Sequence, residues 1–227
     1  MLKIALITLL SLPLVANFFP TSMHSSIQSV KGDKITLSKA FPINGMSGVV
    51  VHTYDNGLDA ITSRITQVTS NGETRLISAD VIHHDELPTI KTPVKPGDKV
   101  IGGYLYNNVL VLAPDADSYA NVTRSNHKKW IHPDLFALYL ATQGEDKPTK
   151  GNLALFAKKY QVGLIYIIRK NSAILLDPIS GQLVAKKTVS GLPNQGQFPF
   201  YMRFDKLQTG WFGSAATGNY YNMVGSL

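Results

Sequence analysis

The run HHDE at residues 83–86 contains four consecutive side chains that could ligate a metal ion or transfer a proton. Adjacent side chains of an extended chain point to opposite sides, so these four cannot all reach one ion. A site would need help from a distant histidine such as His52, His127 or His132, and the sequence contains no HExxH motif. We therefore predict no metal site and no bound cofactor.

Other patterns typical of catalysis are absent from the sequence. It contains no GxSxG turn for a nucleophilic serine, and neither GxxxxGK[ST] nor GxGxxG for a phosphate group. The chain has no cysteine, which excludes thiol catalysis, cysteine metal sites and disulfides. No Asp or Glu stands out as half of a pair for glycoside cleavage. We predict a protein that is not an enzyme and keep an envelope hydrolase with an unrecognised site as a second alternative.

The whole chain has a formal net charge of +7, and the positive charge is concentrated in its second half. Residues 1–117 carry nine Lys and Arg against ten Asp and Glu, whereas residues 118–227 carry 13 against five. Three lysine pairs stand in this basic half: Lys128 and Lys129, Lys158 and Lys159, Lys186 and Lys187. They are either solvated faces or a surface for an acidic polymer, lipid or protein. No recognition-helix, zinc-finger or RNP pattern is present, so we expect no nucleic-acid partner.

Residues 1–20 have the pattern of a secretory signal peptide. Lys3 precedes an apolar run over residues 4–12, which Pro13 interrupts. A membrane-spanning helix needs about 20 apolar residues, so a retained anchor is the weaker interpretation. We expect export to the periplasm, the outer membrane or the cell surface, and a Ser/Thr-rich linker over residues 21–33.

Two helix signals occur back to back between residues 130 and 168. Pro133 suits the first position of a helix and Gly144 suits its end, while Thr149 can cap a second helix that ends at Gly163. The apolar faces expected for the two helices are Leu135, Leu138 and Tyr139, and Leu153, Phe156, Ala157 and Tyr160. The β-branched run LIYII then predicts a buried strand. A helical hairpin that leads into a strand is thus expected at the centre of the fold.

The rest of the chain is typical of short strands joined by tight turns. The turn signals are Asn71-Gly72, Asn107-Asn108, Asn171-Ser172 and Ser180-Gly181. We predict an α+β fold over residues 34–205, in which β-hairpins form a curved sheet or small barrel around a central two-helix hairpin. Residues 118–129 are expected to be a polar connection, residues 198–204 a final strand, and residues 206–227 an aromatic, glycine-rich tail.

Three stretches, read in order, resemble the N-terminal domain of the bacterial plasminogen-binding protein PgbA family. They are SGVVVHTYDNGLDAI (47–61), KPGDKVIGGYLYNNVLVLAPD (95–115) and the helical hairpin with its strand (132–167). The resemblance runs from about residue 34 to residue 187. It implies a non-enzymatic, adhesin-like or envelope protein, exported by a Gram-negative bacterium, that captures host plasminogen.

This resemblance implies lysines as the binding residues. Kringle modules hold a lysine by pairing its ammonium with acidic residues, so we predict binding through Lys128, Lys129, Lys158, Lys159, Lys186 and Lys187. The alternative is an envelope scaffold or assembly module whose basic half contacts an acidic polymer or lipid. Strong salt dependence without competition by a lysine analogue would favour that alternative.

Overall fold

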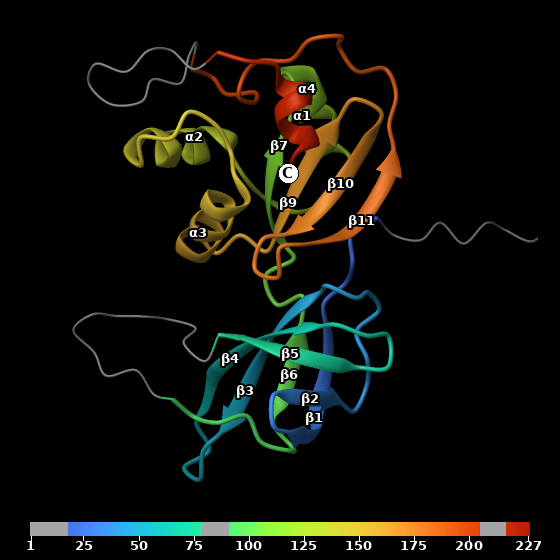
Figure 1. The fold of residues 1–227 in the computed structure, drawn as a ribbon, viewed down its shortest axis with the longest axis vertical. Helices are drawn as coiled ribbons and strands as arrows, with labels where there is room; N and C mark the ends of the chain where they lie inside the picture. Colours follow the sequence, from blue (N-terminus) through green and yellow to red (C-terminus); the bar gives the residue numbers. More distant parts are fainter. Residues whose placement is uncertain (1–17, 79–90, 205–216) are drawn as a thin grey trace, which may run out of the picture.

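The computed structural model describes residues 18–78, 91–204 and 217–227. They form two lobes stacked along the long axis of the molecule, a barrel below and a sheet flanked by helices above (Figure 1). The α+β architecture with a small barrel is therefore confirmed. None of the described helices combines the length and the apolar character that crossing a membrane requires.

The lower lobe is a closed antiparallel barrel with the strand order β1-β2-β5-β4-β3-β6. Its strands are β1 (Met23–Lys31), β2 (Lys34–Leu37), β3 (Ser47–Thr53), β4 (Asp59–Gln67), β5 (Glu73–Ser78) and β6 (Lys99–Gly102). Alternate side chains such as Ile35, Val50 and Ile65 are buried inside, as expected for a barrel too narrow to enclose a channel. The hairpin expected at Asn71-Gly72 is confirmed, because it joins β4 to β5.

The upper lobe is a five-stranded mixed sheet with the order β11-β10-β9-β7-β8. Its strands are β7 (Asn108–Leu112), β8 (Lys129–Ile131), β9 (Leu164–Arg169), β10 (Ser172–Asp177) and β11 (Gln182–Thr188). β7 runs parallel to both of its neighbours, whereas β9, β10 and β11 are antiparallel hairpins. The hairpins expected at Asn171-Ser172 and Ser180-Gly181 are confirmed.

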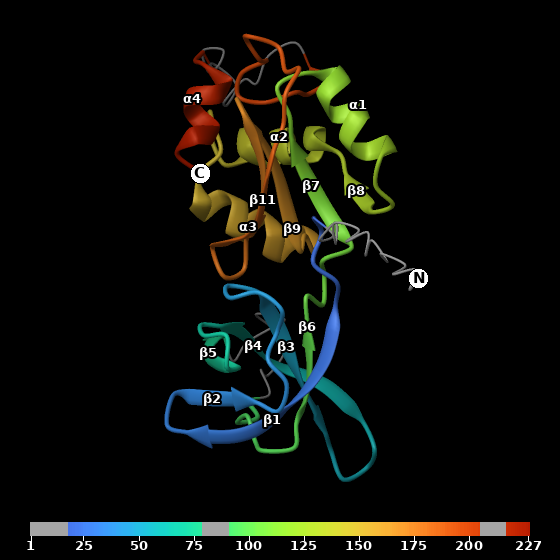
Figure 2. The same ribbon diagram turned by 90° about the vertical axis from the view of Figure 1, so that its right-hand side faces the viewer.

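Helices cover both faces of this sheet (Figure 2). They are α1 (Ala116–Arg124), α2 (Pro133–Thr142), α3 (Lys150–Tyr160) and α4 (Tyr220–Gly225). The residues of α2, α3 and α4 form one apolar core with one face of the sheet, and α1 packs on the opposite face. Each crossover from β7 to β8 and from β8 to β9 thus passes through helix, as parallel strands require.

The central helical hairpin follows the caps expected from the sequence. The His132 side chain accepts a hydrogen bond from the backbone N–H of Asp134 at the start of α2. Thr149 and Asn152 form a reciprocal capping box at the start of α3. The helix α3 ends at Gln161, which adopts a left-handed conformation with φ of 56°.

Two segments expected to be irregular form regular structure instead. The expected linker at residues 21–33 instead contains β1, whose Ile27 side chain is buried in the barrel. The expected polar connection after residue 118 contains α1, which Asp115 caps by accepting from the N–H of Ser118. Both segments are rich in small polar residues, a composition typical of loops. The sequence therefore did not indicate a strand and a helix that each bury only one side.

The chain ends differ from expectation as well. The strand expected at residues 198–204 is irregular backbone, and Phe200 in it is buried against α2. The expected tail contains α4, which buries Tyr220 and Val224 in the upper core. The rest of that tail, residues 206–216, and the expected leader up to residue 17 lie outside the described residues.

The turn expected at Asn107-Asn108 is not a hairpin turn. β6 belongs to the barrel and β7 to the upper sheet, so this segment carries the chain from one lobe to the other. The barrel interior and one face of the upper sheet form a single apolar cluster that includes Met46, Tyr106 and Val111. The two lobes therefore share one core.

Candidate binding surfaces

A buried carboxylate joins the two lobes. Asp177, at the end of β10, is fully buried and accepts hydrogen bonds from the Ser47 N–H at 2.9 Å and the Tyr106 hydroxyl at 2.7 Å. Its other oxygen accepts from the backbone N–H groups of Ile179 and Ser180. Burial and the neighbouring Asp177 charge raise the pKa of Tyr106 far above its ordinary value, so the phenol stays a donor. This saturated network has a structural role.

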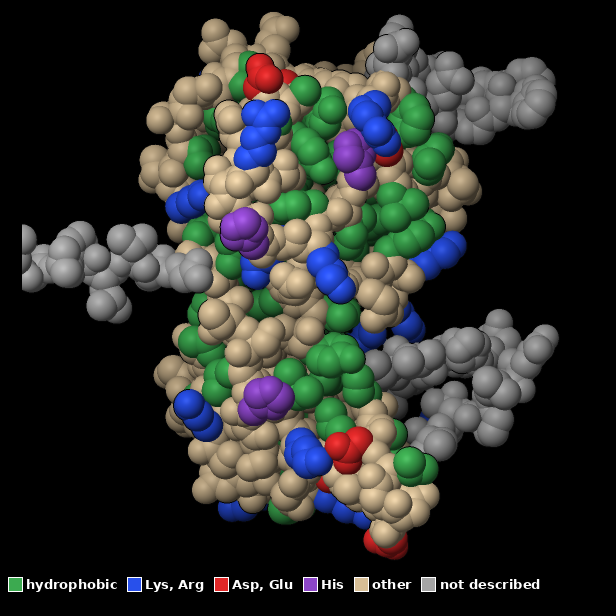
Figure 3. Space-filling view, turned by 180° about the vertical axis from the view of Figure 1, so that it is seen from behind, with side chains coloured by type: hydrophobic (Ala, Val, Ile, Leu, Met, Phe, Trp, Pro, Cys, Tyr) green, Lys and Arg blue, Asp and Glu red, His purple; other side chains and the backbone are tan. Residues whose placement is uncertain are grey.

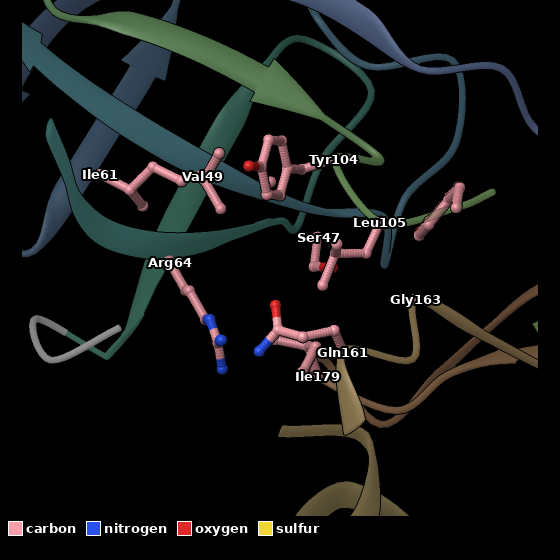
Figure 4. A pocket seen from close by; sticks show the side chains of 11 residues that line it. Ser47, Val49, Ile61, Arg64, Tyr104, Leu105, Gln161, Gly163 and Ile179 are labelled. Carbon is pink, nitrogen blue, oxygen red and sulfur yellow. The ribbon is translucent and has the colours of Figure 1, made fainter. Parts of the chain in front are cut away.

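A small pocket lies beside this network, where β3 and β4 of the barrel meet the turn after α3 (Figure 4). Its volume is about 100 Å³, and Val49, Tyr104 and Ile179 give it apolar walls. The Arg64 and Gln161 side chains extend toward each other at its mouth. A cavity of this size holds a few water molecules rather than a drug-sized ligand, which needs about 300 Å³ or more.

The lysine pair on β11 is divided between the two faces of the sheet. Lys187 pairs with Ala173, which faces the core on the α1 side, and Lys186 pairs with Ile174, which faces the core under α2 and α3. Successive strand residues point to opposite faces, so the two ammonium groups are separated by the sheet. These neighbours in sequence do not form one doubly charged patch.

Three of the predicted lysines lie near aromatic rings, and Lys159, at 5.7 Å from the ring centroid of its neighbour Tyr160, is the most distant of them. The Lys128 ammonium lies 5.0 Å from the Phe19 ring centroid and donates to the Tyr106 carbonyl at 3.3 Å. The Lys187 ammonium lies 4.6 Å from the Phe18 ring centroid. Partial burial lowers the pKa of both ammonium groups. Lys128 and Lys187 are thus committed to contacts within the chain.

The pair on α3 lies differently. Lys158 and Lys159 occupy the last turn of the helix, where positive charge is favoured by the helix dipole, and both are exposed. Neither forms an ion pair within the described ranges. Leu155, one turn earlier on the same face, is 61% exposed. Lys129 and Lys186 are also exposed, without ion pairs among the described residues.

The outer side of the helical hairpin is apolar as well as basic. Leu135 and Leu138 of α2 are 37% and 52% exposed, although the helical spacing predicted that they face the core. That prediction was wrong for these two residues because Phe136, Ala137 and Leu140 make the buried face instead. On α3, the predicted inward residues Leu153 and Phe156 are fully buried. Exposed leucine beside unpaired lysine is typical of a contact surface.

The lysines are dispersed rather than gathered. On the face seen in Figure 3, Lys and Arg side chains lie singly over both lobes, and hydrophobic side chains occupy much of the surface between them. In the barrel, Lys34 lies 3.3 Å from Glu73 and Lys99 lies 3.0 Å from Asp59. Lys31, Lys39 and Arg75 of the barrel are exposed without an ion pair among the described residues, so unpaired cations occur in both lobes.

The histidines considered as metal ligands have other partners. His52 Nδ1 lies 2.7 Å from Asp98 Oδ1, and His132 contacts Asp134 at the start of α2. Within the described residues no group of three or more His, Cys, Asp or Glu could hold a metal ion. The run at residues 83–86 lies outside the described residues.

Asp134 is the centre of a charged cluster at the start of α2. It accepts from the Arg203 N–H at 2.9 Å and from the Arg203 guanidinium at 2.5 Å. Burial alone would raise the pKa of Asp134, but the hydrogen bonds from Arg203 outweigh it and lower the pKa. Burial lowers the pKa of His132, against the attraction of Asp134.

Comparison with known proteins gives one family and two relatives. The family model described as "Plasminogen-binding protein pgbA N-terminal" matches residues 22–227. The chain is 29% identical over 136 residues to the plasminogen-binding protein PgbA of Helicobacter pylori strain J99 / ATCC 700824, and 28% identical to that of strain ATCC 700392 / 26695. Each match covers 59% of this chain but only 29% of the relative. No solved structure matches the chain significantly.

Proposed function

We propose, from the premise that the chain belongs to the plasminogen-binding protein PgbA N-terminal family, that it is an exported envelope or surface protein which binds plasminogen through exposed lysines. The family is named for binding rather than for catalysis. The chain matches only 29% of the length of each of the two relatives. We therefore infer plasminogen binding for this chain as a proposal.

The observation that carries the proposal is the state of Lys158 and Lys159. A kringle pocket pairs the ligand ammonium with acidic groups, so the ammonium must be accessible and free of other partners. Lys158 meets this requirement, whereas exposed Lys159 lies 5.7 Å from the Tyr160 ring centroid, and exposed Leu155 adds apolar surface next to them. Lys129 and Lys186 come next as single exposed cations. Lys128 and Lys187 come last, because their ring contacts would have to break.

The test is binding of the purified chain to immobilised plasminogen, with and without 6-aminohexanoic acid, at two salt concentrations. We expect binding that the lysine analogue abolishes and that largely survives the higher salt concentration. The double variant K158A/K159A should weaken this binding about tenfold or more, as loss of a charge-assisted contact predicts.

The matched control is K34A/K99A, which removes two barrel lysines already held in ion pairs. It leaves the same net charge as K158A/K159A and should bind plasminogen like the unmodified chain. Equal losses in the two double variants would mean that net charge alone attracts plasminogen, which contradicts the proposed lysine site.

A second candidate function is an envelope scaffold that contacts an acidic polymer or lipid. The charge distribution favours it, since residues 118–227 carry 13 Lys and Arg against five Asp and Glu. Binding to anionic vesicles that is lost at the higher salt concentration, together with plasminogen binding that 6-aminohexanoic acid does not compete, would select this function.

A further inference from the structure

A groove lies between α1 and the upper sheet, away from the lysines of α3. Its volume is about 240 Å³. The side of α1 that faces it carries polar residues at helical spacing, which is unusual for the sheet-facing side of a helix. The polar residues that line the groove are Ser118, Asn121, Ser125, Asn126, Tyr166, Lys187 and Ser190.

Two nearly buried hydroxyl groups in this groove lack partners. Ser118 is 8% exposed and Tyr166 is 1% exposed, and neither hydroxyl makes a hydrogen bond within the described residues. In the described part of the chain, only Thr66 Oγ1 is both fully enclosed and without a hydrogen-bond partner. The Ser118 and Tyr166 hydroxyl oxygens, which also lack partners, are therefore not fully enclosed and reach the groove surface. Buried hydroxyl groups are normally satisfied by protein or water. Their position at a groove therefore points to a polar occupant.

A cation that contacts aromatic rings but no carboxylate among the described residues borders the same groove. The Lys187 ammonium lies 5.6 Å from the Tyr166 ring centroid and has no ion pair among the described residues. The pKa of this ammonium is lowered by its partial burial. An anionic group in the groove would offset that cost.

We propose that this groove binds a sugar unit that carries a carboxylate. The hydroxyl groups of Ser118 and Tyr166 and the amide of Asn121 can each pair with ligand hydroxyls, since each of them both donates and accepts hydrogen bonds. Lys187 would pair with the carboxylate. Apolar lining residues cover the C–H faces of a sugar ring; they are Val122, Ile168, Val189 and Leu192.

An acidic peptide side chain is the competing occupant. It would use Lys187 and a few donors but would leave the acceptors of the groove unmatched. A lone carboxylate also would not fill a cavity of about 240 Å³. The proposal is independent of plasminogen, because neither Lys158 nor Lys159 lines this groove.

The test is an NMR titration of the full chain with three probes. They are methyl β-D-glucuronide, the matched neutral methyl β-D-glucoside, and glutarate as a carboxylate without hydroxyl groups. We expect the glucuronide to bind about tenfold more tightly than either of the others, because a charge-assisted hydrogen bond and the hydroxyl contacts act together. Shifted resonances should include the backbone amides of α1 and β11.

Variants assign the effect to the groove. Lys187→Met should abolish the preference for glucuronide over glucoside, while Lys186→Met, on the opposite face of β11, should keep it. Tyr166→Phe and Ser118→Ala, which keep the packing, should weaken both sugars several-fold. Thermal unfolding of each variant checks that it is folded.

Three results would overturn the proposal. They are no glucuronide binding to the unmodified chain, glutarate binding as tight as that of glucuronide, and a Lys187→Met variant that keeps the preference. The second result would assign the groove to acidic peptides.

Discussion

In the barrel, Lys34 and Lys99 lie within 3.3 Å of carboxylates, whereas in the upper lobe Lys158 and Lys159 have no ion pair among the described residues. Exposed ion pairs add little stability, typically about 0–1 kcal/mol, so this difference is not about holding the fold together. It concerns availability, because a cation that already has a partner must lose it to bind another molecule. Lys158 and Lys159 are therefore more available to a partner molecule than Lys34 and Lys99 are.

The lobes also differ in their cavities. The groove of about 240 Å³ with its two unpaired hydroxyls lies within the upper lobe, whereas two cavities of about 100 and 290 Å³ lie where the barrel meets turns of the upper lobe. Both proposed binding sites lie in the upper lobe, and we expect the barrel to support that lobe. The following predictions test that division.

The largest effect is expected from breaking the junction between the lobes. Asp177→Ala would leave four donors without an acceptor, of which the Ser47 N–H and the Tyr106 hydroxyl are buried. We expect the free energy of unfolding to fall by about 3–5 kcal/mol, measured by urea denaturation. Asp177→Asn, which keeps one acceptor oxygen, should cost less. A urea midpoint unchanged by Asp177→Ala would contradict the role of this network.

The turn after α3 should tolerate no side chain. A Cβ on Gly163 would lie 2.0 Å from the Leu105 carbonyl oxygen, which belongs to the connection between the lobes. We expect Gly163→Ala to lower the free energy of unfolding by about 1–3 kcal/mol. Gly151→Ala is the matched control in α3, where the nearest atom is 3.8 Å away, and it should raise stability by up to about 1 kcal/mol. Equal stability of the two variants would show that the lobes are not packed closely at this turn.

Lysines of the upper lobe should separate into two classes by stability. Lys128→Ala and Lys187→Ala remove ring contacts, so each should cost about 0.5–1 kcal/mol in thermal unfolding. Lys158→Ala should cause no loss, because its ammonium makes no ion pair or ring contact in the described part of the chain. A loss for Lys158→Ala as large as for Lys128→Ala would show that Lys158 is not free.

The smallest effect is a pH dependence at the start of α2. The pKa of His132 is lowered in the folded chain, so below about pH 6.5 the unfolded chain binds a proton that the folded chain does not. Stability should therefore fall as the pH drops below 6.5. The lowered pKa of Asp134 adds a further loss once the pH falls below its unfolded value of 3.8.

His132→Asn keeps a side-chain acceptor at the cap of α2 and should flatten the first part of this profile. The measurement is the urea midpoint of both proteins between pH 7 and pH 5. A parallel decline in the two proteins would assign the pH dependence to other groups.

Local signals in the sequence predicted the elements better than their partners. Pro133 and Thr149 begin the two helices as expected, since caps depend on neighbouring residues, whereas α3 ends at left-handed Gln161, before the expected Gly163. The division into two lobes was not predictable, because β6 and β7 follow each other closely and nothing local indicates that they join different sheets. β1 was missed because its Ser-rich segment buries little more than Ile27.

The candidate sites depend on facts that a sequence does not state. The spacing of Lys186 and Lys187 suggested one charged patch, whereas the strand divides them between two faces. The groove beside α1 combines residues 118–126 with residues 166–192, and only the fold brings these together. The one local signal for the groove was the helical spacing of polar residues in α1. In the sequence, that segment was predicted to be a polar connection.

The path of the chain has a mechanical consequence. Phe19 packs against Tyr166 and Trp130 of the upper lobe before the barrel begins, and Leu227 is buried in that same lobe after α4. A pulling force applied between these two points is therefore borne first by the upper lobe, and the barrel comes under tension only after the Phe19 contacts break. If the chain is tethered near either point, the barrel behaves as a side branch off the line of tension, able to keep its shape while the upper lobe bears the strain.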